Sequence, residues 1–148
     1  MPDTLPVVAY LDTNALVKLY LPEPQGSGRV QALIEATDGV ATSAITYPEA
    51  RGVFARVLAR TQLSTQEHDE RLSAFESDWL TLTVVDLTER VYRRAGDLMA
   101  AHPTLRGMDA IQLSSALEAR EDAGIRFLSF DTDLQHVAEA MLHRSEIG

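Results

Sequence analysis

The stretch Tyr10–Leu16, which reads YLDTNAL, indicates the fold more directly than any other part of the chain. It overlaps an apolar run, Val7–Leu11, that is too short for a helix and has the continuous apolar character of a buried strand. Asp12 follows directly, and an amphipathic helical pattern then extends over 15–20. The stretch therefore predicts a buried strand that ends at an aspartate and leads into a helix.

Short apolar runs and longer helical patterns alternate along the rest of the chain. Runs rich in β-branched or aromatic residues, and bounded by turn residues, predict strands at Val7–Leu11, Val40–Ser43, Leu82–Asp86 and Ile125–Phe130. Amphipathic patterns predict helices at about 15–20, 27–36, 47–61, 66–80, 89–101, 109–122 and 133–142. Such alternation is typical of a parallel sheet covered by helices on both faces. We therefore predict an α/β fold with a central parallel sheet of four to five strands.

Polar residues mark the starts of several predicted helices. Thr46 with Glu49, and Ser64 with Glu67, have the spacing of a capping box, in which a side chain and a backbone N–H at each end satisfy one another. Thr88 can cap the helix that follows Asp86. These positions predict helix starts at about residues 47, 66 and 89.

The composition suits one domain that folds without covalent cross-links. The chain has 148 residues, is 45% hydrophobic and contains no repeat or low-complexity linker, so we expect a single domain over 1–148. It has no cysteine, which excludes disulfides and thiolate metal sites. It has neither a signal-peptide pattern at its start nor an apolar run of membrane length. We therefore expect a cytoplasmic protein without a membrane segment.

The net charge of -9 argues against a nucleic-acid partner, because affinity for a polyanion comes mainly from basic groups that neutralise phosphates. The argument weakens if some of the acids hold divalent cations, since a bound cation reverses the local charge. Lys18 is the only lysine, and all other basic side chains except histidine are arginine. Arginine suits bidentate phosphate contacts, but genome composition is the simpler explanation of this bias.

Several acids stand where the predicted fold would gather them. Asp12 and Asp131 each follow a strand directly, and ligands of open α/β sheets bind at the carboxyl ends of strands. Glu49 and Asp109 lie in the first turns of predicted helices. Each acid alone also has a structural explanation: Asp12 and Asp133 as helix caps, Glu49 in a capping box, and Asp109 at a favourable end of a helix dipole.

Together these acids predict a cation site. Converging carboxylates repel one another and lose solvation, at a cost of several kcal/mol unless cations or protons neutralise them. Oxygen ligands favour a hard cation, Mg²⁺ or Mn²⁺, and such ions support phosphodiester hydrolysis without a covalent nucleophile. Asn14 is expected to bond the Asp12 carboxylate or a water near it.

Four fragments resemble PIN-domain nucleases, and especially the VapC-type toxins of bacterial toxin–antitoxin pairs. The fragments cover nearly the whole chain in the family's order and spacing, and they are Tyr10–Tyr20, Thr42–Arg60, Gly107–Leu113 and Leu128–Leu134. The resemblance implies a small α/β endoribonuclease that cleaves RNA with Mg²⁺ or Mn²⁺. It also implies a homodimer that is bound by an antitoxin protein.

The resemblance also implies roles for individual residues. The expected catalytic acids are Asp12, Glu49, Asp109 and Asp131. The expected metal ligands are Asp12, Asp109, Asp131 and Asp133, although family members vary at the position of Asp133. Thr13 or Asn14 matches the family's supporting polar position. The family usually ends with one more strand, and since only 144–148 follow the last helix pattern, that strand should be very short or missing here.

Three arginines are candidates for contacts with RNA phosphates. Arg56 and Arg60 lie on the helix that carries Glu49 and match a basic feature of the family's helix, while Arg106 precedes Asp109. An ordinary solvated helix face is the alternative explanation for the first two.

Three other functions are compatible with an aspartate after the first strand. A haloacid dehalogenase-type phosphohydrolase would carry a second aspartate two residues on, where this chain has Asn14. A receiver-like metal-binding module would need a lysine late in the fold, and Lys18 is far too early. An inactive PIN-like interaction domain has no need to retain all four acids.

Overall fold

The computed structural model describes the backbone of residues 4–21 and 25–147. The strands and helices follow one another in the order β1 (Val7–Leu11), α1 (Thr13–Val17), α2 (Ser27–Glu35), β2 (Gly39–Ser43), α3 (Thr46–Arg60), α4 (Thr65–Trp79), β3 (Thr83–Val85), α5 (Glu89–Ala101), α6 (Gly107–Ala119), β4 (Gly124–Leu128) and α7 (Thr132–Ile147). Every predicted element is present, and the boundaries differ by a few residues. The helix start predicted at Asp109 lies two residues earlier, at Gly107.

The four strands form one parallel sheet in the order β3-β2-β1-β4. Tyr10 of β1 lies beside Ala41 of β2 on one side and Phe127 of β4 on the other. Because all strands run the same way, Leu11, Ser43 and Leu128 end at one edge of the sheet. After β4 the described chain continues as α7 up to Ile147, so no further strand follows it within residues 25–147.

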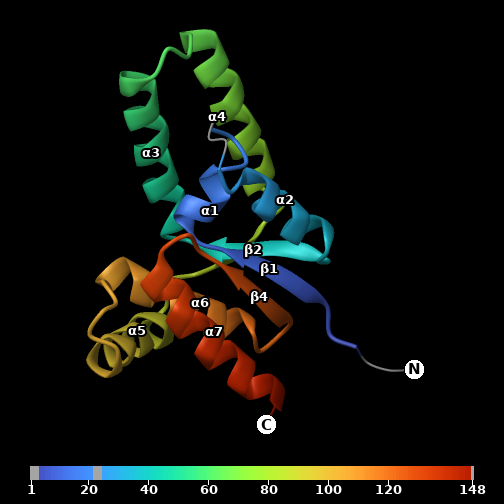
Figure 1. The fold of residues 1–148 in the computed structure, drawn as a ribbon, viewed down its shortest axis with the longest axis vertical. Helices are drawn as coiled ribbons and strands as arrows, with labels where there is room; N and C mark the ends of the chain where they lie inside the picture. The colour runs from blue at the N-terminus through green and yellow to red at the C-terminus, as the bar shows by residue number, and fades with distance from the viewer. Residues whose placement is uncertain (1–3, 22–24, 148) are drawn as a thin grey trace.

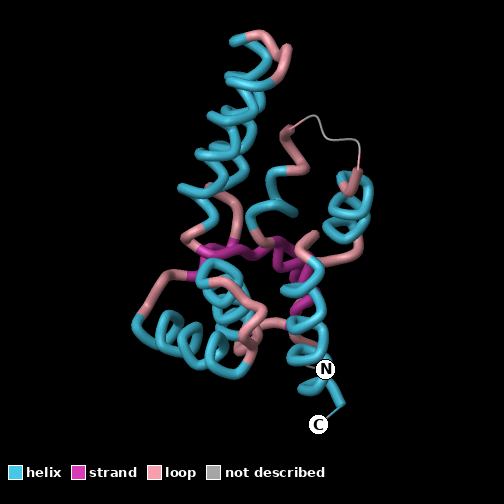
Figure 2. Tube along the Cα trace, turned by 60° about the vertical axis from the view of Figure 1, so that its left-hand side comes forward, coloured by secondary structure: helices cyan, strands magenta, loops and turns pink. Residues whose placement is uncertain are grey.

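Helices cover both faces of the sheet, as predicted (Figure 1, Figure 2). Alternate residues of β1 face opposite layers: Tyr10 packs with residues of α5, α6 and α7, whereas Ala9 and Leu11 pack with residues of α1, α2, α3 and α4. These two groups of side chains are the hydrophobic cores above and below the sheet. β1 therefore lies at the centre of the molecule, and its end is held from both sides.

The α3–α4 hairpin extends away from the sheet (Figure 1). Its base is closed by aromatic packing around Phe75, which is fully buried and lies 5.4 Å from Phe54, 5.8 Å from Tyr47 and 5.7 Å from Trp79 between ring centroids. Aromatic pairs at such distances stabilise a core beyond the burial of their area. This packing fixes the first half of α3, on which Glu49 lies.

Two of the three predicted helix caps are confirmed. Ser64 Oγ accepts the N–H of Glu67 at 3.1 Å within a reciprocal capping box, and Thr88 Oγ1 accepts the N–H of Val91 at 3.3 Å. The predicted box of Thr46 with Glu49 is wrong, because the N-cap of α3 is Ile45 and makes no side-chain bond. Thr46 is fully buried inside the fold, so its hydroxyl bonds other buried side chains rather than the helix end.

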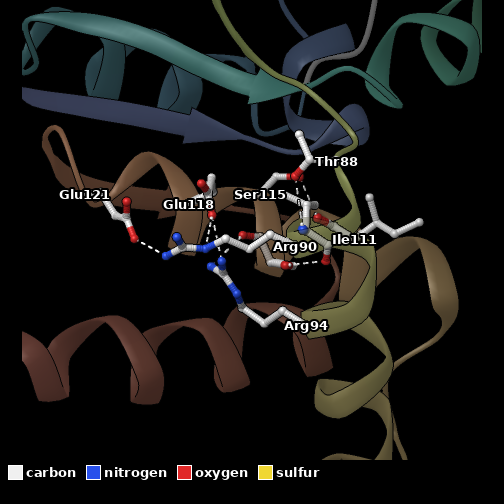
Figure 3. Close-up of polar contacts among 9 residues, drawn as sticks. Thr88, Arg90, Arg94, Ile111, Ser115, Glu118 and Glu121 are labelled. Carbon is white, nitrogen blue, oxygen red and sulfur yellow. Dashed lines mark hydrogen bonds and ion pairs between the residues drawn. The ribbon is translucent and has the colours of Figure 1, made fainter.

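Ion pairs join α5 to α6, whose first turn carries Asp109 (Figure 3). Arg94 donates to the Glu118 carboxylate at 2.6 Å, and Arg90 contacts both Glu118 and Glu121. Beneath them the buried Ser114 hydroxyl donates to the Val91 carbonyl at 2.7 Å. These bonds join α6 to α5 along their length.

In the part of the chain that the structure describes, none of the helices is both long enough and apolar enough to cross a membrane.

Candidate active site

Asp12 lies directly after β1 and is 4% exposed. Its Oδ1 accepts the N–H of Ala15 at 3.0 Å, so it caps α1, and the Ser129 hydroxyl also bonds its carboxylate. The pKa of Asp12 is raised to about 6, chiefly by burial and also by the nearby charges of Asp109 and Glu49, while those two hydrogen bonds lower it. Asp12 therefore caps α1 and is also a buried carboxylate whose ionised form is unfavourable.

Glu49 reaches the same place from the first turn of α3. Thr13, the first residue of α1, donates its hydroxyl to Glu49 Oε1 at 2.6 Å, a bond between residues 36 positions apart. Because the predicted capping box with Thr46 does not form, the Glu49 carboxylate is available for this contact. Thr13, one of the two residues predicted to support the acids, therefore bonds a predicted acid directly.

Asp109 comes from the first turn of α6 and is partly buried. Its Oδ2 accepts the backbone N–H of Arg106 at 3.1 Å. Burial raises the pKa of Asp109, and the negative charges of Asp131 and Asp133 add to this, whereas the Arg106 N–H and its positive charge oppose it. Asp109 thus lies close enough to Asp131 and Asp133 for their charges to affect its pKa, and its own charge raises the pKa of Asp12.

A cavity of about 380 Å³ opens at this edge of the sheet. Its walls combine three acids with polar and apolar neighbours, namely Asp12, Thr13, Asn14, Pro48, Glu49, Gly52, Val53, Arg56, Met108, Asp109 and Gln112. A larger cavity of about 510 Å³, between α2, β4 and α7, is lined by none of the predicted acids. The smaller cavity is therefore the candidate active site.

Asp131 and Asp133 stand at the margin of this cavity rather than in its wall. Asp131 Oδ1 accepts the N–H of Leu134 at 2.9 Å, so it caps the start of α7, and Asp133 is exposed in the first turn of that helix. The charges of both acids raise the pKa of Asp109, so both lie near it.

The donor set fits a hard divalent cation. Asp12, Glu49 and Asp109 offer only carboxylate oxygens, the ligands that Mg²⁺ and Mn²⁺ prefer. Burial raises the pKa values of Asp12 and Asp109, and neighbouring carboxylates raise them as well. Among the side chains of the described residues, no three acidic or histidine groups already converge to the spacing of a coordinated ion.

Of the predicted polar and basic residues, Asn14 and Arg56 line the cavity, whereas Arg60 and Arg106 do not. Asn14 Oδ1 accepts the N–H of Phe130 at 3.3 Å, so its amide ties α1 to the loop that carries Asp131, and the expected bond to Asp12 is not formed. The guanidinium of Arg56 lies over Gly52 in the cavity wall, where a Cβ on Gly52 would approach Arg56 Nη1 to 3.2 Å. Arg60 is exposed at the end of α3 and does not reach the cavity wall. Arg106 is exposed beside Asp109 and lowers its pKa.

Two polar residues beneath the site were not predicted. Gln112 lines the cavity three residues after Asp109, and Tyr10 bonds it from the centre of β1. The spacing of Gln112 from Asp109 on an otherwise apolar helix is the only sequence signal that could have identified it.

Comparison with known proteins gives a consistent result. Residues 9–140 match the sequence model of the PIN domain. Two proteins of Mycobacterium tuberculosis, named Ribonuclease VapC45 and Ribonuclease VapC49, are each 36% identical to this chain over 136 residues, which is 92% of this chain and 92% of theirs. A chain in the structure of a toxin–antitoxin complex from Klebsiella pneumoniae superposes with a TM-score of 0.61 at 20% identity, covering 84% of this chain and 87% of that one, and so shares the fold.

The match to the family model spans most of the chain, and the two ribonucleases are similar over nearly their full length. The parallel four-stranded sheet with acids at the carboxyl ends of its strands agrees with both observations. The chain belongs to the PIN-domain family.

Proposed function

We propose that this protein is a metal-dependent endoribonuclease and the toxin of a toxin–antitoxin pair. The observation that carries the proposal is the cavity at the end of β1 that Asp12, Glu49 and Asp109 line together. The names of the two relatives, both VapC ribonucleases, support RNA as the substrate. The toxin–antitoxin complex that shares the fold supports an antitoxin as the partner.

In this proposal Asp12, Glu49 and Asp109 hold Mg²⁺ or Mn²⁺, and Asp131 completes the site from the side of α7. A bound divalent ion supplies positive charge that polarises the phosphodiester and makes water a better nucleophile. Asp133, which is exposed, contributes negative charge at the margin of the site rather than a fixed ligand.

Binding of the RNA backbone falls to the cationic groups beside the acids. Arg56 lines the cavity and is the best placed side chain to contact a phosphate next to the scissile one. Arg106 is exposed at the rim next to Asp109, so it serves a phosphate further along the strand. The positive charge of the metal and of these arginines reconciles an RNA substrate with the net charge of -9.

A homodimer that is neutralised by an antitoxin completes the proposal. An arginine of the antitoxin, inserted among the carboxylates, would replace the missing positive charge and block the site.

The test is to incubate the purified protein with total RNA in Mn²⁺ or in EDTA and to sequence the new RNA ends. We expect discrete ends in Mn²⁺ that are absent in EDTA and absent with Asp12→Asn. If the wild type and Asp12→Asn produce the same ends, cleavage does not come from this site and the proposal fails.

A further inference from the structure

We infer that Gln112 is a positioning residue, which fixes both the Glu49 carboxylate and the end of β1 through a directed hydrogen-bond network. The inference rests on the proposed function, because it assigns the network a role in holding metal ligands. It concerns side chains beneath the carboxylates rather than the carboxylates themselves.

Gln112 occupies a central place in the site. It lies on α6, one turn after Asp109, is 2% exposed and forms part of the cavity wall. Its amide has three partners: the Tyr10 hydroxyl lies 2.7 Å from Oε1, and Nε2 lies 3.0 Å from Thr46 Oγ1 and 3.3 Å from Thr13 Oγ1. One side chain thus joins β1, α1, α3 and α6.

Tyr10 determines which way round the amide lies. The Tyr10 hydroxyl donates to Gln112 Oε1, which lies 2.7 Å away. The ring is fully buried and stacks on Phe127 with the centroids 5.4 Å apart, which leaves it no room to turn away. With Oε1 facing Tyr10, both N–H groups of Gln112 face the two threonines.

The first arm of the network ends on Glu49. Thr13 Oγ1 accepts an N–H from Gln112, and its own proton is then free to point at Glu49 Oε1, 2.6 Å away. A carboxylate can only accept, so the single Thr13 proton goes to Glu49, and the Thr13 oxygen accepts from Gln112. Gln112 therefore holds in place the hydroxyl that bonds Glu49.

The second arm ends on the backbone next to Asp12. The Thr42 hydroxyl lies 2.7 Å from the Leu11 carbonyl, which can only accept, so the single Thr42 proton goes there. The Thr46 and Thr42 hydroxyls lie 2.8 Å apart, and Thr46 must then donate to Thr42 while accepting from Gln112. This arm holds the residue before Asp12 through four buried groups.

Every donor and acceptor in the two arms has one consistent role, and the amide of Gln112 is the group they share. An apolar side chain at this position removes the donor for both threonines. A carboxylate there would accept instead of donate, so Thr13 would turn its proton away from Glu49. Loss of outer partners of metal ligands typically costs about 10–100-fold in metal affinity or activity.

The first experiment measures Mn²⁺ affinity directly, from the electron paramagnetic resonance signal of free Mn²⁺ during titration of the full-length protein. We expect Gln112→Met, which keeps the size of the side chain, to bind Mn²⁺ about 10–100-fold more weakly than wild type. The control is Ser114→Ala, a second buried polar residue of α6, whose hydroxyl donates to Val91 and does not touch the site. Ser114→Ala should lose stability but bind Mn²⁺ within about twofold of wild type.

Tyr10→Phe provides a test that does not alter Gln112 itself. It removes only the group that orients the amide, so we expect a smaller loss of Mn²⁺ affinity than in Gln112→Met. Because both residues act through one chain of bonds, the double variant should bind no more weakly than Gln112→Met alone. Losses that add would contradict the network, and Tyr10→Phe keeps the inference testable if Gln112→Met does not fold.

Kinetics on an RNA oligonucleotide carrying a mapped cleavage site separate positioning from substrate binding. Gln112→Met should lower kcat about 10-fold or more with KM within about twofold of wild type, measured at saturating Mn²⁺. Wild-type Mn²⁺ affinity and kcat in folded Gln112→Met and Tyr10→Phe would overturn the inference while leaving the nuclease proposal intact. Conversely, weakened Mn²⁺ binding in Gln112→Met, with no RNA cleavage by wild type, would support the network and refute the nuclease.

Discussion

Replacement of Asp12 by asparagine should stabilise the metal-free protein at neutral pH, even though it abolishes activity. Asp12 is buried at the end of β1, and its pKa of about 6 lies above the ordinary value of 3.8. An acid with a raised pKa in the folded state holds its proton more tightly there than in the unfolded chain. It therefore destabilises the fold progressively as the pH rises from about 4 to about 6, and fully above that range.

The size of the effect follows from the shift. A difference of about 2 pKa units corresponds to about 3 kcal/mol at 1.36 kcal/mol per unit, as an upper limit on the penalty at pH 7.5. Asparagine has nearly the same shape, caps a helix as well as aspartate does, and carries no charge, so it should recover most of that free energy. In a domain of this size the corresponding rise in Tm is about 6–12 °C.

The assay is urea unfolding of wild type and Asp12→Asn in EDTA, at pH 4 and at pH 7.5. The two proteins should be nearly equally stable at pH 4, and Asp12→Asn should be more stable at pH 7.5. The control, Asp97→Asn, replaces an exposed carboxylate on α5 and should stay within about 0.5 kcal/mol of wild type at both pH values. A variant that is no more stable than wild type at pH 7.5, or a difference that does not change with pH, would refute the reasoning.

Two further changes test separate parts of the structure. Arg56→Gln should weaken RNA binding uniformly across sequences and lower by about one the slope of log affinity against log salt concentration. Arg60→Gln, which lies outside the cavity wall, should change neither the affinity nor the slope. Filter binding at several salt concentrations measures both, and equal effects of the two variants would place the phosphate contacts elsewhere. Ser64→Ala should lower the free energy of unfolding by about 1 kcal/mol in a urea titration, because it removes the N-cap of α4, and unchanged stability would show that the capping box contributes nothing.

The sequence was sufficient to predict the sheet and the acids at its edge. Val7–Leu11 and the run beginning at Ile125 are short, apolar and β-branched, and few structures other than buried strands suit such runs. An aspartate directly after each of them must then lie at the carboxyl edge of a parallel sheet. For that reason Asp12 could be placed before the structure was known, together with the edge at which Asp131 lies.

Sequence spacing did not predict the hydrogen-bond partners of side chains that are buried between distant elements. Thr46 and Glu49 have the spacing of a capping box, but Thr46 is buried against Thr42 and Gln112, and this removes its hydroxyl from the helix end. Asn14 likewise bonds the backbone after β4, a partner more than one hundred residues away in sequence. Gln112 lies within the fragment Gly107–Leu113, but its role could not be predicted, since only the folded arrangement of four elements gives its amide three partners.

We propose that carboxylates at the end of β1 hold a divalent cation and that this cation makes the protein a ribonuclease. The most direct measurement is cleavage of a mapped RNA oligonucleotide as a function of Mn²⁺ concentration, by wild type and by Asp109→Asn. We predict saturable Mn²⁺-dependent cleavage by wild type and none by the variant, whose circular dichroism spectrum should match that of wild type. Equal cleavage by both proteins, or wild-type cleavage that persists in EDTA, would contradict the claim.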